Sequence, residues 1–431
     1  MLKRASLFLL LPAFLFLSFK ELRGQAASSP FSSFGLGDFN GSALVNNYGM
    51  AGAGVSNPQA WYLNNLNPSM LVYNRLTVFQ AGLLLEKTNL STGDQASKTT
   101  NGNVNYLALG FPVKWNKSRT AIAWGSAVGL MPYTHMSYRL KSQGTVPGTL
   151  TTSYLSEKSE GGFNQLYWSN GVRINKSLSV GMKASYLFSS IISDFTNVVG
   201  LADQASRYQI ALHEVLSVSG ARFMPSVHYR IDSVGGRFFF NVGATYEIAK
   251  KVNSTLFQKI ERKNSSGTIL QYDSLLNSNS KINFPGILNA GISFGNSDKW
   301  VIAADYALIQ FDGNQAQVGA DRFTVNTGTK LTLGAEFTPD ARSMTSVLKR
   351  ITYRTGVSTE KSPYLVNGNT LKDMGVNFGF SLPVNRISSL DFAVRFGKRG
   401  DRALNGLLEN YFKVYFGVTF NDQWFIKSRF D

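Results

Sequence analysis

The chain contains no cysteine and few charged residues: 16% of its 431 residues are charged, and three are histidines. An average soluble domain carries roughly 25% charged residues. The absence of cysteine excludes disulfide bonds, zinc sites with cysteine ligands and a cysteine nucleophile. Aromatic residues make up 13% of the chain, which argues against a disordered protein. The composition is unusual for a cytosolic enzyme, and the length suits two or three ordinary domains or one large barrel.

Long apolar runs are also scarce, and the clearest one lies at the N-terminus, from Leu7 to Phe19 after two basic residues. This run is shorter than the roughly 20 apolar residues that a transmembrane helix needs. Small residues follow it up to Ala26. We therefore interpret residues 1–26 as a signal peptide rather than a membrane-spanning helix. No later segment has an apolar run of spanning length, so we expect no transmembrane helix in the rest of the chain.

The chain instead shows a repeated alternation with a period of two. Near the C-terminus the alternating apolar residues are Phe412, Val414, Phe416, Val418 and Phe420, and polar or small residues lie between them. Side chains on a strand point alternately to opposite faces, so this pattern predicts a strand with one apolar face. The same pattern recurs along residues 71–431 and predicts about fourteen strands.

Both a soluble sandwich and a membrane barrel would show this alternation. Here the less apolar face is dominated by Gly, Ser, Thr, Asn and Ala, which suits a crowded barrel interior, and the aromatic-rich face suits lipid. Short turns alternate with longer polar segments, such as Thr88–Gly102, Lys141–Glu160 and Thr359–Lys372, which we interpret as loops. We predict an all-β fold: a transmembrane antiparallel β-barrel of the kind found in the outer membrane of Gram-negative bacteria.

Residues that could support catalysis are sparse. His135, His213 and His228 each lie within a predicted strand, and Glu214 follows His213 and therefore faces the other side of its strand. The sequence lacks the second histidine of a zinc-protease helix and a phosphate-binding glycine loop. We expect no catalytic residue, no metal site and no cofactor. The net charge is +17, but the basic residues are scattered rather than clustered, so we expect no nucleic-acid partner.

Some basic residues fall on the predicted inward face of the barrel. They could draw anionic solutes or lipid carboxylates into the lumen. They could equally form ion pairs across the interior, since buried charges are usually paired. The basic positions are Lys183, Arg395 and Lys413, and the acidic partners we consider are Asp305, Asp373 and Asp391.

The third predicted strand contains Gly129 and Pro132. Proline cannot donate the hydrogen bond that a strand interior requires, so Pro132 predicts a kink or a gap in the barrel wall. The alternative is a bulge near the rim without a transport role.

These residues, together with a segment before the first strand, resemble the FadL-like outer-membrane transporters of long-chain fatty acids and other hydrophobic compounds. That family has an N-terminal hatch with a Gly-Met-Gly-Gly-Ala-Gly stretch followed by Asn-Pro-Ala. In this chain Ala51 replaces a glycine of the stretch, and Ser69 replaces the final alanine. The matching hatch positions are Gly49, Gly52, Gly54, Asn67, Pro68 and Ser69, and the family's kinked third strand corresponds to Gly129 and Pro132.

The resemblance implies a lumenal hatch at residues 27–70 and a barrel at residues 71–431. It also implies that a hydrophobic ligand, such as a fatty acid, enters from outside and leaves sideways into membrane lipid near the kinked third strand. Some proteins with this likeness act instead as accessory subunits of outer-membrane secretion or assembly machines. The sequence therefore predicts passive transport, with a non-transporting scaffold subunit and outer-membrane protein partners as the alternative.

Overall fold

The computed structural model describes residues 29–93, 95–114, 122–145, 151–200, 208–264, 266–296, 299–313, 315–318, 321–385 and 387–422. The predicted signal peptide lies outside this part of the chain. Within it, fourteen antiparallel wall strands close a barrel, which confirms the predicted fold class. Twelve wall strands or parts of strands precede β14. They are β2 (Thr77–Thr92), β3 (Gln95–Lys114), β4 (Trp124–Pro132), β5 (Thr134–Thr145), β6 (Thr152–Gly161), β7 (Phe163–Arg173), β8 (Leu178–Gly200), β9 (Tyr208–Val234), β10 (Phe238–Glu247), β11 (Lys250–Lys263), β12 (Ile269–Phe284) and β13 (Gly286–Asn296). The remaining wall strands are β14 (Trp300–Gln310), β17 (Gly328–Phe337), β18 (Thr352–Val366), β19 (Asn369–Pro383), β20 (Ser388–Asp401) and β21 (Leu407–Asp422).

Four of the wall strands are interrupted, each by one or two residues. The two halves of each are β4 and β5, β6 and β7, β10 and β11, and β12 and β13. The ring closes where β21 pairs with β2, from Thr77 opposite Asp422 to Ser91 opposite Leu408. Every pair of neighbouring wall strands is antiparallel. Because side chains alternate between the two faces of a strand, the apolar residues of each strand can all point to the outside of the ring.

The period of two in the sequence matches the burial of the side chains. On β20, Asp391 and Arg395 face the interior and are 1% and 7% exposed, whereas Phe396 faces outward and is 53% exposed. Outward-facing large apolar side chains recur on neighbouring strands, including Val376 and Phe378 on β19. The fold is thus that of an outer-membrane-type barrel, with apolar side chains covering its outer wall.

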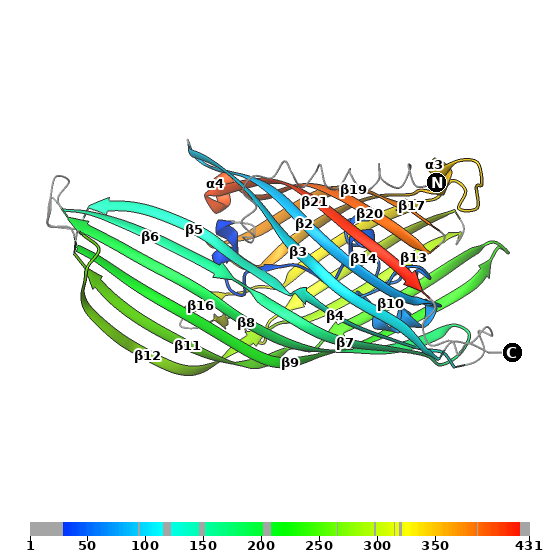
Figure 1. Ribbon diagram of the computed structural model, residues 1–431, viewed down its shortest axis with the longest axis horizontal. Helices are drawn as coiled ribbons and strands as arrows, with labels where there is room; N and C mark the ends of the chain where they lie inside the picture. Colours follow the sequence, from blue (N-terminus) through cyan, green and yellow to red (C-terminus); the bar gives the residue numbers. More distant parts are fainter. Residues whose placement is uncertain are drawn as a thin grey trace, which may run out of the picture.

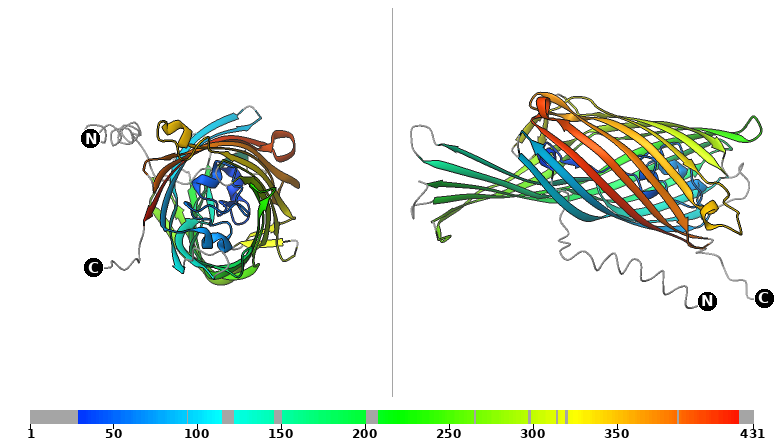
Figure 2. Two further views of the ribbon diagram at one scale, coloured as in Figure 1. Left: turned by 90° about the vertical axis from the view of Figure 1, so that its right-hand side faces the viewer. Right: turned by 90° about the horizontal axis from the view of Figure 1, so that it is seen from above.

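The barrel has two unlike sectors (Figures 1 and 2). In the closed sector, which runs through β14, β17–β21, β2 and β3, each strand except β3 pairs with both neighbours over most of its length. In the other sector, β5, β6, β8, β9, β11 and β12 pair in that order and project beyond the rest of the wall as a curved half-tube. We call this half-tube the extension.

The prediction of long loops is wrong at all three segments named above. Most of Thr88–Gly102 and of Lys141–Glu160 belongs to strands, and Thr359–Lys372 is a hairpin that turns at Asn367 and Gly368. The reason is that both faces of a strand end can meet water beyond the apolar band. The apolar alternation is then lost while the backbone ladder continues.

The lumen contains the N-terminal part of the described chain (Figure 2). This plug consists of η1 (Pro30–Ser33), β1 (Asp38–Phe39), α2 (Val45–Tyr48) and η2 (Pro68–Tyr73), and the first wall strand begins at Thr77. Between wall strands, α3 (Val347–Arg350) connects β17 to β18 and α4 (Arg402–Asn405) connects β20 to β21. A hairpin of β15 (Gln315–Val318) and β16 (Asp321–Thr324) follows β14, and its Val318 and Phe323 pack in one hydrophobic cluster with Leu36 of the plug. Within the described residues, the helices are too short and too polar to span a membrane.

Candidate functional site: the plug and the seam beside β3

The Asn67-Pro68-Ser69 motif starts η2 at the centre of the plug. The side chain of Asn67 accepts hydrogen bonds from the Ser69 backbone at 3.1 Å and from its hydroxyl at 2.5 Å, so Asn67 is the N-cap of this short helix. Pro68 occupies the first helical position, where its missing N–H costs nothing. The amide of Asn67 also donates to the carbonyls of Val55 and Val227, at 2.8 and 3.0 Å. The motif thereby ties the plug to itself and to strand β9.

The glycine stretch is fastened to the opposite wall by a carboxylate. The backbone N–H groups of Gly54 and Val55 donate to Asp305 on β14, at 2.7 and 2.9 Å. Gly52 has a φ of 93°, and Ala51 before it has a φ of 58°, a region that L-residues other than glycine rarely adopt. Ala51 replaces a glycine of the family motif, and the backbone at Ala51 has a conformation that favours glycine.

Close approach between the plug and the wall explains part of the glycine on the inward strand faces. A Cβ at Gly181 would lie 2.4 Å from the Ser69 nitrogen, and one at Gly379 would lie 2.7 Å from the Gly49 Cα. Any larger residue at these wall positions would push the plug away from the wall. The plug is therefore packed backbone against backbone.

The inward basic residues have different partners. Arg395 lies 2.9 Å from Asp373, and Lys413 lies 3.1 Å from Glu86. Lys183 forms no ion pair within the described residues; its ammonium donates to the Ser42 hydroxyl and the Asn65 carbonyl of the plug, at 3.2 and 3.3 Å.

The two aspartates that remain do not pair with these basic residues. Asp305 binds the plug backbone, and Asp391 accepts hydrogen bonds from Ser381 and Thr419. Tyr62 of the plug lies close to Asp391 and is partly buried. Burial raises the pKa of Tyr62 to about 12, and the charge of Asp391 adds to the shift, so this hydroxyl stays neutral.

Gly129 and Pro132 lie where the wall is interrupted. A Cβ at Gly129 would lie 2.4 Å from the Tyr167 hydroxyl, so this position is crowded. Pro132 ends β4, and Tyr133 separates it from β5. β3 pairs with β4 only as far as the register Leu107 to Leu130. Beyond that point β3 and β5 share no ladder in the described chain, and we call this interruption the seam.

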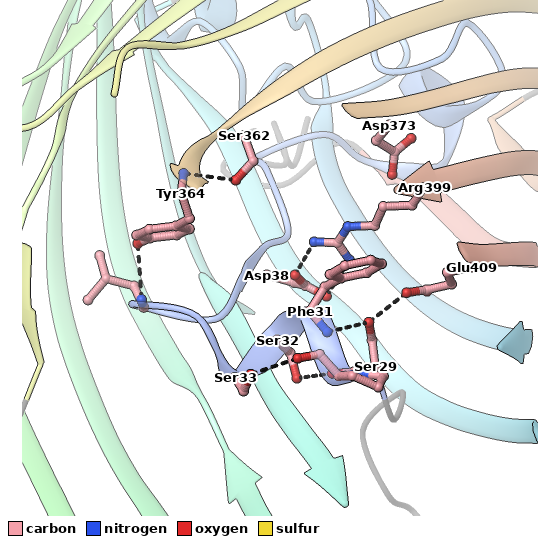
Figure 3. A network of polar contacts seen from close by, with 12 residues as sticks. Ser29, Phe31, Ser32, Ser33, Asp38, Ser362, Tyr364, Asp373, Arg399 and Glu409 are labelled. Carbon is pink, nitrogen blue, oxygen red and sulfur yellow. Dashed lines mark hydrogen bonds and ion pairs between the residues drawn. The ribbon is translucent and has the colours of Figure 1, made fainter. Parts of the chain in front are cut away.

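The first residues of the described chain, Ser29–Asn40, run inside the barrel between β5 and the strands β20 and β21, and we call them the strap. Figure 3 shows the polar contacts of the strap with Arg399, Glu409 and Tyr364. On one side the strap pairs with β5, through the β1 ladder and through a hydrogen bond from the Ser29 N–H to the Ser137 carbonyl at 2.9 Å. On the other side Ser29 donates to Glu409 at 2.6 Å, and Asp38 forms a two-bond ion pair with Arg399. The strap therefore joins β5 to the closed sector where β3 and β5 do not meet.

A cavity of about 130 Å³ lies between the strap and the wall. Aromatic side chains contribute to its lining, but its charged groups are arranged as four ion pairs. These pairs are Asp38 with Arg399, Asp373 with Arg395, Glu86 with Lys413, and Glu360 with Lys330. The cavity is therefore polar and balanced in charge.

Sequence reasoning missed Arg222, which is 1% exposed. Its guanidinium lies 3.0 Å from Glu247, donates to the Tyr133 hydroxyl and donates to the Pro285 carbonyl at 2.6 Å and the Ile248 carbonyl at 3.3 Å. Tyr133, Ile248 and Pro285 are the residues at three of the wall-strand interruptions. One arginine thus joins three breaks that are distant in the chain. The sequence shows only that an arginine lies within a predicted strand, and it does not show which residues this arginine contacts.

The strap contacts and the role of Asp305 were also missed. Asp305 is visible in the sequence only as one polar residue on an alternating strand. Glu409 and Arg399 occur near a strand end, where charged residues are common. In the described residues no group of His, Asp and Glu side chains is arranged to hold a metal ion.

Solved structures with a similar fold include a CymD monoaromatic hydrocarbon channel, with 16% identity and a TM-score of 0.58 over 89% of this chain and 98% of that one. The Pseudomonas putida toluene transporter TodX has 14% identity and a TM-score of 0.58, over 90% and 99% of the two chains. A Pseudomonas aeruginosa FadL homologue has 10% identity and a TM-score of 0.54, over 89% and 98%. At these identities the similarity establishes the fold, and it confirms the resemblance to the FadL-like barrels.

A comparison with curated proteins finds no match. The protein family described as BamG matches residues 1–431, the whole chain. With its plugged fourteen-stranded barrel, the chain therefore belongs to the BamG family and shares its fold with the FadL-like transporters.

Proposed function

We propose that this protein resides in the outer membrane of a Gram-negative bacterium and acts as a scaffold subunit of a protein-secretion or assembly complex, with its lumen sealed. The observation that carries this proposal is the charged lining of the cavity beneath the strap. A hydrophobic compound in this cavity would lie against four ion pairs. Removing water from such groups without replacing its hydrogen bonds is costly.

The way the plug is fastened also favours a sealed lumen. Asp305 and Lys183 of the wall bind two different parts of the plug, Asn67 of the plug binds the wall at Val227, and wall glycines hold the plug backbone in close contact. A transport path would require several of these contacts to break together. A scaffold needs them to persist, because a rigid interior keeps the outer surface in one shape.

The extension supplies a surface that a partner protein could cover. Leu140, Leu155 and Ile210 share one face of the sheet and are 37%, 41% and 46% exposed. Closer to the barrel, the same face carries Leu216 and Leu256, which are buried. Apolar side chains exposed beyond the main barrel wall are typical of protein interaction sites.

A second candidate function is passive transport of long-chain fatty acids or other hydrophobic compounds, with lateral exit near the kinked third strand. The seam favours it, because within the described residues β3 and β5 share no ladder beyond Leu107 and Leu130, and the strap joins β5 to the closed sector from within. Similar folds occur in a hydrocarbon channel and a toluene transporter. Displacement of the strap would open this route.

One engineered disulfide separates the two functions. Phe39 and Thr134 are directly opposite in the β1–β5 ladder, and such cross-strand positions have Cβ atoms about 4.5–5.5 Å apart, close to disulfide geometry. In this cysteine-free chain, Phe39→Cys with Thr134→Cys would lock the strap to β5 on oxidation. We expect the oxidised protein to co-purify with a larger barrel or a lipoprotein from gently solubilised outer membranes as well as the unchanged protein does.

The control is the same double variant kept reduced, with Phe39→Cys alone as a second control. If the protein is a transporter, oxidation should abolish entry of a labelled fatty acid or hydrocarbon and reduction should restore it. Recovery of bound lipid with no stoichiometric protein partner would contradict the scaffold proposal. A variant with Leu140, Leu155 and Ile210 all changed to Ser should lose the partner while remaining a folded, heat-modifiable barrel.

A further inference from the structure

The outer face of the closed sector carries three lysines at the edge of its apolar band. Lys361 on β18 and Lys372 on β19 are directly opposite each other in the ladder. Lys398 on β20 is opposite Met374, so it is the diagonal neighbour of Lys372. All three are exposed on the outward face. Cross-strand neighbours have Cβ atoms about 5 Å apart and diagonal ones about 7–8 Å apart, so the three ammonium groups can reach one common anion.

These lysines have no counter-ion within the described protein. None of the three forms an ion pair there. The adjacent carboxylates in the chain, Glu360 and Asp373, face the interior and pair with Lys330 and Arg395. Like charges directly opposite each other on neighbouring strands are destabilising. Within the described residues, no carboxylate offsets the repulsion between Lys361 and Lys372. An external anion would offset it.

The position of the lysines indicates where such an anion comes from. The first outward row below Lys398 consists of Val357, Val376 and Phe396, which are 46%, 41% and 53% exposed. These side chains belong to the apolar band of the barrel wall. Lysines immediately above such a band place their charged ends at the level of lipid headgroups.

Three lysines on the outward face of the extension show the opposite arrangement. Lys158 pairs with Glu160, at 2.7 Å. Lys259 and Lys263 both pair with Glu261. These three lysines of the extension therefore have protein counter-ions, whereas Lys361, Lys372 and Lys398 form no ion pair within the described residues. They provide a comparison in which the same charge lies on an outward face but is already neutralised by the protein.

We propose that Lys361, Lys372 and Lys398 form a binding site for the phosphate group of a lipid in the outer leaflet of the membrane. The three ammonium groups bind the phosphate, and the acyl chains of the same lipid lie against the apolar row below. The site fixes a phosphorylated lipid to the closed sector, on the outer face of the wall. It uses no lumenal residue, so it is independent of whether the protein acts as a scaffold or a transporter.

The test measures lipid retained by the purified full-length protein, by native mass spectrometry after exchange into detergent with added lipid. The probes are lipid A that carries two phosphates and the same lipid after removal of both phosphates. The variant changes Lys361, Lys372 and Lys398 to Gln. The matched control changes Lys158, Lys259 and Lys263 to Gln, which removes the same charge from the same outward face of the extension.

Each lysine near an anionic lipid surface contributes about fivefold to binding, so we expect the triple variant to lose roughly a hundredfold in affinity for phosphorylated lipid A. The control variant should retain it within about threefold. Binding of the dephosphorylated lipid should be weak for both variants and for the unchanged protein. The heat-modifiable gel shift should persist in both variants, because all of these lysines are at least partly exposed.

Three results would overturn the proposal. Equal losses in the two triple variants would show a general effect of net charge. Equal retention of phosphorylated and dephosphorylated lipid would show that the acyl chains alone bind. Displacement of the lipid by inorganic phosphate at matched ionic strength would show a site for free phosphate rather than for a lipid headgroup.

Discussion

The closed sector and the extension are built from the same kind of strand but differ in their outward charges and in the continuity of their strands. Strands of the closed sector carry unpaired outward lysines next to the apolar band. Strands of the extension continue further, pair three of their outward lysines with carboxylates, and include one half of each of the four interrupted wall strands. The comparison shows that the interruptions allow the strands of the extension to diverge from the rest of the wall while they still pair with one another. Arg222 contacts three of these interruptions and so holds them close together.

The largest effect should come from Arg222→Ala, which removes the group that joins the breaks at Tyr133, Ile248 and Pro285. Glu247 would then be a buried carboxylate without its partner. Breaking a buried ion pair in this way costs about 3–5 kcal/mol in the free energy of unfolding. The measurement is urea-induced unfolding in lipid vesicles, followed by tryptophan fluorescence.

The control for that change is the double variant Arg222→Ala with Glu247→Ala. If the penalty arises from the unpaired carboxylate, the double variant should recover part of the lost stability. A single variant within about 1 kcal/mol of the unchanged protein would contradict the role assigned to this arginine. Proteolysis should then cut the extension no faster than the closed sector.

A smaller effect should follow from Asp305→Ala, which tests the closed sector alone. The N–H groups of Gly54 and Val55 would lose their acceptor in a buried setting. Leaving such groups unsatisfied costs about 2 kcal/mol. Hydrogen exchange should speed up at these two amides in the plug, while amides in the extension keep their protection. Asp305→Asn retains an acceptor oxygen and should lose less; equal losses in the two variants would argue against the hydrogen bonds.

The smallest effect should come from Ala51→Gly, and it should be stabilising. Ala51 has a φ of 58°, and the left-handed region costs a residue with a Cβ about 1 kcal/mol relative to glycine. The unfolding midpoint should rise slightly, while β-barrel signals and the extension stay unchanged. Ala51→Val provides the opposite change, because a β-branched residue is still less tolerant of this backbone. A lower midpoint for the glycine variant would show that the Cβ of Ala51 makes a packing contact that outweighs the backbone cost.

Much of the wall was predictable because its pattern is local. The alternation around Phe412–Phe420 predicts both a strand and its outward face, since neighbouring side chains must point to opposite sides. The expected loops at Thr88–Gly102 and Lys141–Glu160 were wrong because alternation is lost where both faces are wet, although the backbone still pairs. The Asn67-Pro68-Ser69 motif was recognisable, and the structure adds the hydrogen bonds by which it starts a helix and reaches β9.

The sequence by itself determined the fold class, the outward apolar face and the presence of an unusual third strand. These follow from the order of residues within about ten positions, because backbone geometry repeats every two residues along a strand. Only the tertiary structure decided that Arg222 meets Tyr133 and Pro285, which are 89 and 63 residues away. It also decided that the strap joins β5 to the closed sector and that some outward lysines lack counter-ions. Such contacts depend on which strands become neighbours and in which register, and these are properties of the closed ring rather than of any one segment.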